Sequence, residues 1–142
     1  MKKLNRGAAE MAMEFNLRGG TDVTGFSLLG HGFEMAEASG VRFQISMGKI
    51  PFVTGARKYA DMWTFPGGAS DNSLFYGPKI HFEEGISEVE RMLLFDPQTS
   101  GGLLLAVPGI LKDDFLGRAK NAGQSAWVIG QVIEGSGLEV IQ

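Results

Sequence analysis

The spacing of apolar residues switches repeatedly along this chain between a helical repeat and a strand repeat, and this alternation restricts the possible folds most. Five segments have helical features, either apolar side chains at steps of three and four or a capping motif: residues 3–15, 26–38, 55–62, 87–95 and 110–122. Four segments have the character of strands: residues 41–47, 103–107, 126–133 and 138–141. The alternation predicts an α+β fold, a layered mixed β-sheet with packed helices.

Two of the strands carry further expectations. Residues 103–107 form a continuous apolar run between glycine and proline, which predicts a strand covered on both faces. The tail, residues 138–141, predicts an edge strand. Between the elements we expect a polar turn at residues 21–25, a turn at Pro66-Gly67-Gly68 and an irregular stretch over residues 69–85.

Length and charge narrow the class of protein. A chain of 142 residues predicts a single domain, residues 1–142. The net charge of −3 gives no electrostatic basis for binding nucleic acid or an acidic membrane surface, and no apolar run approaches the length of a membrane span. The chain has no cysteine, which excludes thiolate metal sites and a cysteine nucleophile within it. We therefore expect a cytoplasmic protein.

The first candidate site is the segment from Thr21 to Phe26. It places Asp22 close to Thr21 and Thr24, just before a predicted helix. A carboxylate is a suitable ligand for Mg²⁺, and a helix start offers free N–H groups to an anion. Spacing alone also allows a simpler interpretation, in which Asp22 or Thr24 caps the helix.

The second candidate is the loop over residues 96–102, which joins a predicted helix to a predicted strand. It combines a carboxylate, an amide, two hydroxyls and two glycines: Asp96, Gln98, Thr99, Ser100, Gly101 and Gly102. Such a loop can present several N–H groups to a phosphate, although an ordinary connection would look similar. The two histidines, His31 and His81, have no metal-ligand spacing; we expect His31 to be partly buried and hydrogen-bonded, and His81 to be solvated.

Both candidate segments resemble signatures of the selenophosphate synthetase family. The residues that carry the resemblance are Thr21-Asp22-Val23-Thr24-Gly25-Phe26-Ser27-Leu28-Leu29-Gly30-His31 and Leu94-Phe95-Asp96-Pro97-Gln98-Thr99-Ser100-Gly101-Gly102-Leu103-Leu104. Shorter landmarks follow the family's order, so the resemblance covers essentially the whole chain: Ile50-Pro51, Pro66-Gly67-Gly68 and Asn72. It implies a superfamily that includes aminoimidazole ribonucleotide synthetase and thiamine monophosphate kinase. Their members pair an N-terminal ATP-binding domain with a C-terminal α+β domain, and the active site lies between the two.

The resemblance also implies an activity and a set of site residues. The intact enzyme would convert selenide, ATP and water to selenophosphate, AMP and phosphate with Mg²⁺. Asp22 matches the aspartate that helps to hold Mg²⁺ against the ATP phosphates. The residues expected to line the substrate and ATP cleft are Thr21, Thr24, Gly25, Asn72, Asp96, Gln98, Thr99, Ser100, Gly101 and Gly102. Two positions depart from the family: Ser27 replaces a glycine, and Asp71 lies where basic residues are usual.

The N-terminal half of the family has no counterpart in these residues. Its cysteine or selenocysteine, its lysine and its further metal-binding aspartates cannot be matched. We therefore expect no catalytic residue in this chain, no synthetase activity from the chain alone, and a need for the missing N-terminal domain or a partner chain. Exposed apolar surface would be compatible with a homodimer. Two other functions remain open: a stand-alone binding or regulatory module without catalysis, and a kinase of a small phosphate ester.

Overall fold

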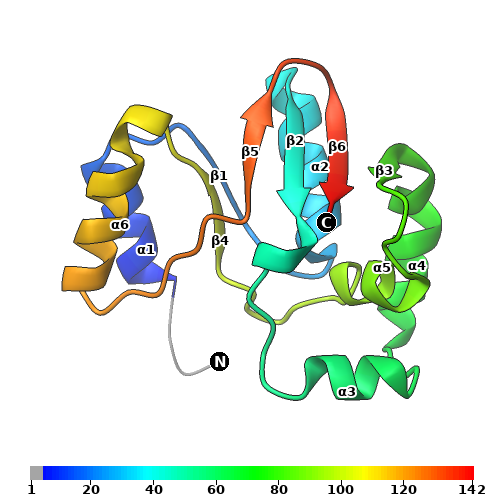
Figure 1. Ribbon diagram of the computed structural model, residues 1–142. Coiled ribbons are helices and arrows are strands. Elements are labelled where there is room, and N and C mark those ends of the chain that lie inside the picture. Colours follow the sequence, from blue (N-terminus) through cyan, green and yellow to red (C-terminus); the bar gives the residue numbers. More distant parts are fainter. Residues whose placement is uncertain (1–4) are drawn as a thin grey trace.

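The computed structural model describes residues 5–142, in which helices and strands alternate (Figure 1). The α-helices are α1 (Arg6–Glu14), α2 (Ser27–Ser39), α3 (Ala56–Asp61), α4 (Gly67–Tyr76), α5 (Glu88–Leu94) and α6 (Lys112–Asn121). The strands are β1 (Gly19–Asp22), β2 (Arg42–Ser46), β3 (Ile80–Phe82), β4 (Leu103–Ala106), β5 (Gly130–Ile133) and β6 (Gly137–Ile141). The predicted α+β class, with helices packed on a mixed sheet, is confirmed.

The main sheet has the strand order β3-β6-β2-β5. The strand β6 runs parallel to both of its neighbours, and β5 runs antiparallel to β2. The tail was expected to form an edge strand, and this was wrong, because β6 lies inside the sheet. Alternation along a strand reports which face is buried, as Leu138 and Val140 are, but it carries no information about the neighbours of the strand.

Most of the hydrophobic core lies between this sheet and the helices α2, α4 and α5. In Figure 1, α2 runs along the sheet, and α4 and α5 lie beside β3. The buried members of this core are Leu29, Phe33, Ala36, Phe43, Ile45, Met47, Tyr76, Ile80, Ile86, Leu94, Phe95, Leu138 and Val140. The core therefore supports α2 and α4, the two helices that adjoin the first candidate segment.

A second, smaller region consists of α1, α6 and the two-stranded sheet β1-β4, on the opposite side of the molecule from α4 and α5 (Figure 1). Met11, Phe115 and Ala119 are its buried residues. The rings of Phe15 and Phe115 meet edge to face at 5.2 Å. The ribbon β1-β4 runs from this region to the main one, so its far end lies where the two regions meet.

The two strands of this ribbon differ from expectation. Residues 19–22 form β1, although a polar turn was predicted over residues 21–25, because Gly19 and Gly20 hide any apolar alternation. All residues of β4 are only half-buried, whereas a strand covered on both faces was predicted. A ribbon of two strands is too narrow to be covered completely by helices.

The stretch after Pro66 was also predicted wrongly. Pro66 itself is extended, but Gly67 and Gly68 form the first turn of α4 instead of a tight turn. Three residues of α4 are buried at helical spacing, namely Ala69, Asn72 and Tyr76. The polar Asn72 in the middle of this set interrupts the apolar repeat, and for this reason the sequence pattern looked irregular.

The predicted helix ends agree with the structure. Gly40 and Gly123 both have a φ of 64° at the ends of α2 and α6, the left-handed conformation that glycine favours. Ser87 and Glu90 form the predicted capping box of α5. Residues 3 and 4 of the first predicted helix lie outside the described residues. None of the helices in the described part of the chain is long and apolar enough to cross a membrane.

Candidate functional site

The two candidate segments lie directly against each other. Strand β1 ends at Asp22, which is paired with Leu103 at the start of β4. Beyond this pair, the Val23 N–H donates to the Gly102 carbonyl at 3.0 Å, and the Gly101 N–H donates to the Val23 carbonyl at 2.9 Å. The backbone therefore joins residues 21–26 to residues 96–102, and we refer to these two segments as the loop pair.

Gly101 and Gly102, at the end of the second segment, are required for different reasons. A Cβ on Gly101 would lie 2.8 Å from both the carbonyl oxygen and the Cγ1 of Val23, so only glycine allows the two backbones to approach this closely. Gly102 has open space around it but a φ of 93°, which side chains rarely tolerate. These two glycines thus shape the junction itself.

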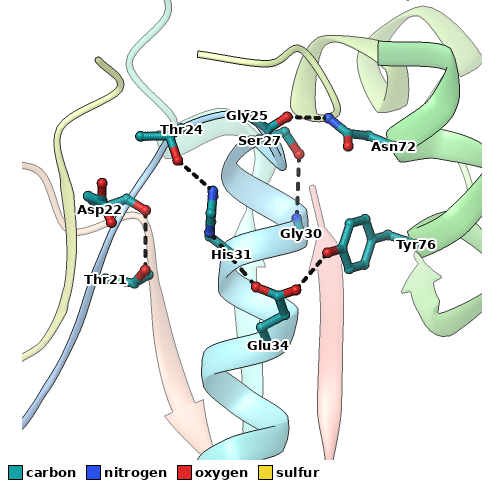
Figure 2. Close-up of polar contacts among 10 residues, drawn as sticks. All are labelled: Thr21, Asp22, Thr24, Gly25, Ser27, Gly30, His31, Glu34, Asn72 and Tyr76. Carbon is teal, nitrogen blue, oxygen red and sulfur yellow. Dashed lines mark hydrogen bonds and ion pairs between the residues drawn. The ribbon is translucent and has the colours of Figure 1, made fainter. Parts of the chain in front are cut away.

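Asn72 connects α4 to the first segment of the loop pair and to Phe95, the residue just before the second segment. Its Nδ2 donates to the Gly25 carbonyl at 2.9 Å (Figure 2). The same Nδ2 donates to the Phe95 carbonyl at 3.1 Å. The side chain is buried, with 7% of its surface exposed. The resemblance placed Asn72 on the cleft, whereas the structure places its amide in the interior, where both N–H groups are used to hold the loops.

Asp22 is exposed, and its carboxylate is unbonded within the described residues. Among residues 5–142, no ion pair or side-chain hydrogen bond engages its carboxylate; only its backbone carbonyl accepts a bond, from the Thr21 hydroxyl at 3.2 Å (Figure 2). Helix α2 begins after Phe26 with no side-chain cap there. The simpler interpretation, in which Asp22 or Thr24 caps the helix, is therefore wrong.

The start of α2 depends on Ser27, the position where the family resemblance expects glycine. Ser27 has a φ of 68° and is fully buried. Its Oγ accepts from the Gly30 N–H at 3.4 Å, which satisfies one of the free donors of the first turn (Figure 2). The left-handed backbone gives a physical reason for a glycine here, and the serine partly offsets its strain with this bond.

A row of polar side chains leads from the loop pair along α2. Thr24 Oγ1 lies 3.0 Å from His31 Nε2, and His31 Nδ1 lies 3.9 Å from Glu34 Oε2. The Tyr76 hydroxyl donates to Glu34 Oε1 at 2.8 Å (Figure 2). Burial, the hydrogen bond to Glu34 and the charge of Glu34 together raise the pKa of Tyr76 to about 12. His31 is thus partly buried and hydrogen-bonded, as expected, and His81 is exposed.

The loop over residues 96–102 divides into an internally bonded part and an open tip. Gln98 Nε2 donates to Asp96 Oδ2 at 2.7 Å and to the Asp96 carbonyl at 3.1 Å. Burial raises the pKa of Asp96, and the bond from Gln98 opposes that effect. Thr99 and Ser100 are exposed, and within the described chain no hydrogen bond engages them. The tip therefore offers backbone and hydroxyl donors that the fold does not use.

The ligand set suits a metal ion that is shared with a substrate. The described residues contain no group of three or more His, Cys, Asp or Glu side chains that could hold an ion. Magnesium commonly takes only one or two protein carboxylates and completes its shell with water and phosphate oxygens. Asp22 alone fits such a partial role and does not fit a closed protein cage.

The candidate residues lie on an open edge of the domain. Two surface cavities, of about 620 and 450 Å³, occur beside β3 and β6, and residues such as His81 line both of them. Neither cavity is lined by Asp22, Thr24 or the tip of the second loop. Neither of these two cavities would therefore enclose a ligand bound at the loop pair.

Comparisons with known proteins identify the family of this chain. The model of the family described as AIR synthase related protein, C-terminal domain, matches residues 1–142. A selenide, water dikinase from Carboxydothermus hydrogenoformans is 39% identical over 142 residues, which are 100% of this chain and 41% of that protein. A selenide, water dikinase from Clostridium botulinum is 40% identical over 134 residues, or 94% of this chain and 39% of that protein. The chain thus spans about two fifths of the length of these relatives.

Solved structures show the same fold at low sequence identity. Thiamine-monophosphate kinase from Stenotrophomonas maltophilia K279a matches with a TM-score of 0.62 and 16% identity, over 91% of this chain and 32% of that one. Thiamine monophosphate kinase from Aquifex aeolicus matches with a TM-score of 0.51 and 16% identity, over 97% of this chain and 36% of that one. On the family match, which covers all of its residues, the chain belongs to the C-terminal domain family of AIR synthase related proteins, and its sequence is similar to the selenide, water dikinases within that group.

Proposed function

We propose that this domain forms one half of an ATP-dependent selenide, water dikinase, and that the loop pair faces a nucleotide held mainly by an N-terminal ATP-binding domain. The observation that supports this most strongly is the contact between the two loops, which leaves the Asp22 carboxylate exposed and unbonded beside the open tip at Thr99 and Ser100. The proposed reaction is inferred from the relatives of about 40% identity, which are named selenide, water dikinase.

In this proposal the loop pair contributes ligands and not reacting groups. The Asp22 carboxylate holds one position of a Mg²⁺ ion, which, when bound, offsets the charge of the ATP phosphates. The N–H groups and hydroxyls of Thr99 and Ser100 donate to phosphate oxygens. Thr21 and Thr24 lie close to Asp22 in the same segment and would adjoin the ion. The other residues of the predicted cleft hold the loops in place: Gly25, Asn72, Asp96, Gln98, Gly101 and Gly102.

The reaction converts selenide, ATP and water to selenophosphate, AMP and phosphate, and this chain is inactive in isolation. One carboxylate cannot balance the charge of a triphosphate, and the described residues contain no group of three or more side chains that could hold a metal ion. The remaining carboxylates, a lysine and the nucleophilic side chain come from the N-terminal half. A cytoplasmic location is part of the same proposal, in keeping with the absence of cysteine.

A chimaera tests the proposal. Residues 1–142 replace the matching portion of the Carboxydothermus hydrogenoformans relative, and selenide-dependent formation of AMP from ATP is measured. We expect activity from the chimaera and none from the chain alone. AMP formation by the isolated chain would contradict the proposal, and so would an inactive chimaera whose circular dichroism and cooperative unfolding show that it is folded.

The same chimaera separates this function from a kinase of a small phosphate ester. The fold is shared with thiamine monophosphate kinases, but the identity to them is only 16–18%. We expect no ADP formation when thiamine monophosphate replaces selenide. ADP formation at a rate comparable to that of the selenide reaction would favour the kinase instead.

A further inference from the structure

The geometry points to His31 as a positioning residue that fixes the direction of the Thr24 hydroxyl: the neutral ring carries its proton on Nδ1, toward Glu34, and accepts the Thr24 hydroxyl proton at Nε2. The Thr24 oxygen is then available only as an acceptor to a ligand at the loop pair. The hydrogen-bond assignment stands on the contacts of this chain, whereas its consequence for ligand binding rests on the proposed function.

The first step is that Thr24 has little freedom. Its carbonyl accepts from the Ser27 N–H and from the Gln98 N–H, each at 3.0 Å. Its hydroxyl lies 3.0 Å from His31 Nε2, a normal hydrogen-bond distance. Because the backbone is held from both sides, the proton on this hydroxyl is the main variable, and the imidazole decides where it points.

The second step concerns the tautomer of the imidazole. Glu34 is an acceptor, and its Oε2 lies 3.9 Å from His31 Nδ1. Its other oxygen is held by the Tyr76 hydroxyl at 2.8 Å, and Tyr76 is 4% exposed. A negative carboxylate fixed in front of Nδ1 favours the ring form with a proton on that nitrogen. The only other side chain with a described contact to the ring is apolar, Phe26, at a centroid distance of 5.4 Å.

The third step is the consequence for the loop pair. A neutral imidazole protonated on Nδ1 has only a lone pair on Nε2, so Thr24 must donate to it. The Thr24 oxygen keeps its lone pairs for a second partner, which must itself be a hydrogen-bond donor or a cation. Water bound to a cation is such a donor, and a phosphate oxygen is not. Two residues after Asp22, Thr24 is therefore suited to orient the hydration shell of Mg²⁺, because Mg²⁺ usually keeps several waters.

The chain offers an internal reference for a direct test. It contains two histidines, of which His31 is partly buried and His81 is exposed. Nitrogen-15 NMR of the imidazoles of the 142-residue chain, recorded with the rings in their neutral form, reports the tautomer of each ring. We expect the Nδ1–H form for His31 and a mixture of forms for His81. A His31 ring protonated mainly on Nε2 would overturn the assignment.

Variants identify the groups that hold the tautomer. Thr24→Val removes the hydroxyl at similar volume, and Glu34→Gln removes the carboxylate charge. Each should move the His31 nitrogen shifts toward those of His81. Glu37→Gln, an exposed glutamate on the same helix, is the matched control and should change neither ring. If Glu34→Gln and Glu37→Gln have the same effect, the positioning role of Glu34 is excluded.

The consequence for Mg²⁺ is tested in the chimaera. A glutamine side chain can place its amide near the position of Nε2, whereas asparagine reaches only about as far as Nδ1. His31→Asn and Thr24→Val should raise the Mg²⁺ concentration for half-maximal rate by about tenfold, the usual effect of losing an outer contact of a metal site. His31→Gln should restore most of the loss. Equal loss in the Asn and Gln variants would overturn the positioning role, while an inactive unmodified chimaera with the expected NMR result would overturn only the proposed function.

Discussion

Two parts of the site differ in how their polar groups are used. We call the bonded part, with Ser27, Asn72, Gly101 and Gly102, the junction, and the exposed part, with Asp22, Thr99 and Ser100, the tip. At the junction, Asn72 donates both amide hydrogens to backbone carbonyls, and the buried Ser27 hydroxyl caps α2. Within the described residues, no buried side-chain N or O lacks a partner. At the tip, the Asp22 carboxylate and residues Thr99 and Ser100 are exposed and have no partner in the described chain.

This difference separates the groups that place the site from those that are available to a ligand. A group already bonded within the fold must break that bond before it can bind anything else, while an exposed unbonded group need only lose water. Substitutions at the junction should therefore change stability, and substitutions at the tip should lower ligand binding with little change in stability. Each prediction below tests one side of this contrast.

The largest effect on stability is expected from Asn72→Ala. The substitution removes two donors and leaves the Gly25 and Phe95 carbonyls without them. We expect a loss of about 2–3 kcal/mol in the free energy of unfolding, measured by urea denaturation, because each buried group left unpaired costs about 1–3 kcal/mol. Asn121→Ala, at an exposed position near the end of α6, is the control and should change stability by less than about 0.5 kcal/mol. Equal effects of the two substitutions on the free energy of unfolding would contradict the stabilising role of Asn72 at the junction.

A smaller effect is expected from a series at Ser27, where strain and capping oppose each other. Ser27→Gly relieves the positive φ of 68° but loses the bond to the Gly30 N–H, and we expect a gain of about 0.5 kcal/mol. Ser27→Ala keeps the strain and loses the bond, and we expect a loss of about 1 kcal/mol. Thermal unfolding should rank the variants Gly, Ser, Ala from most to least stable, and an alanine variant more stable than the glycine variant would refute this account of the start of α2.

The smallest effect is expected from Asp96→Asn, and it should depend on pH. Burial raises the pKa of Asp96 above its ordinary value of 3.8, so the folded state holds that proton more tightly than the unfolded state does. The stability from this group is complete below pH 3.8 and is lost as the pH rises through the raised pKa. Asparagine lacks this loss, so the variant should gain stability relative to the original protein as the pH rises from about 4 to 7, by less than about 1 kcal/mol because the carboxyl is partly exposed. Urea denaturation at a series of pH values measures the difference, and a gain that is the same at both ends would contradict the proposed cause.

The fold was predictable where a local signal marks an element. Glycine ends α2 and α6, a serine and a glutamate cap α5, and strict alternation marks β2. Three features were missed because their cause is not local. Strand β1 forms because it pairs with β4. The buried face of α4 includes the polar Asn72, so it lacks an apolar repeat. The internal position of β6 depends on which strands pair with it.

The candidate site shows the same limit. The sequence motifs singled out both members of the loop pair, and the backbone bonds between them confirm that the two segments lie together. Pattern alone could not separate the groups at the junction from those at the tip. Asn72 and Gln98 look like ligand-binding amides in the sequence, but their donors are used inside the fold. The positive φ of Ser27 likewise could not be predicted, because a serine in a sequence does not indicate a left-handed backbone.

The most direct test of the central claim is the Mg²⁺ dependence of the chimaera carrying Asp22→Asn. The carboxylate is exposed and unbonded among the described residues, so the free energy of unfolding should stay within about 0.5 kcal/mol of the parent value. Selenide-dependent AMP formation should fall by about 100-fold or more, because a lost metal ligand removes several kcal/mol of charge stabilisation. Asp114→Asn, an exposed aspartate on α6, should leave both values unchanged. A folded Asp22→Asn chimaera with the parental rate and Mg²⁺ requirement would contradict the assignment of Asp22 as the ligand that this domain presents.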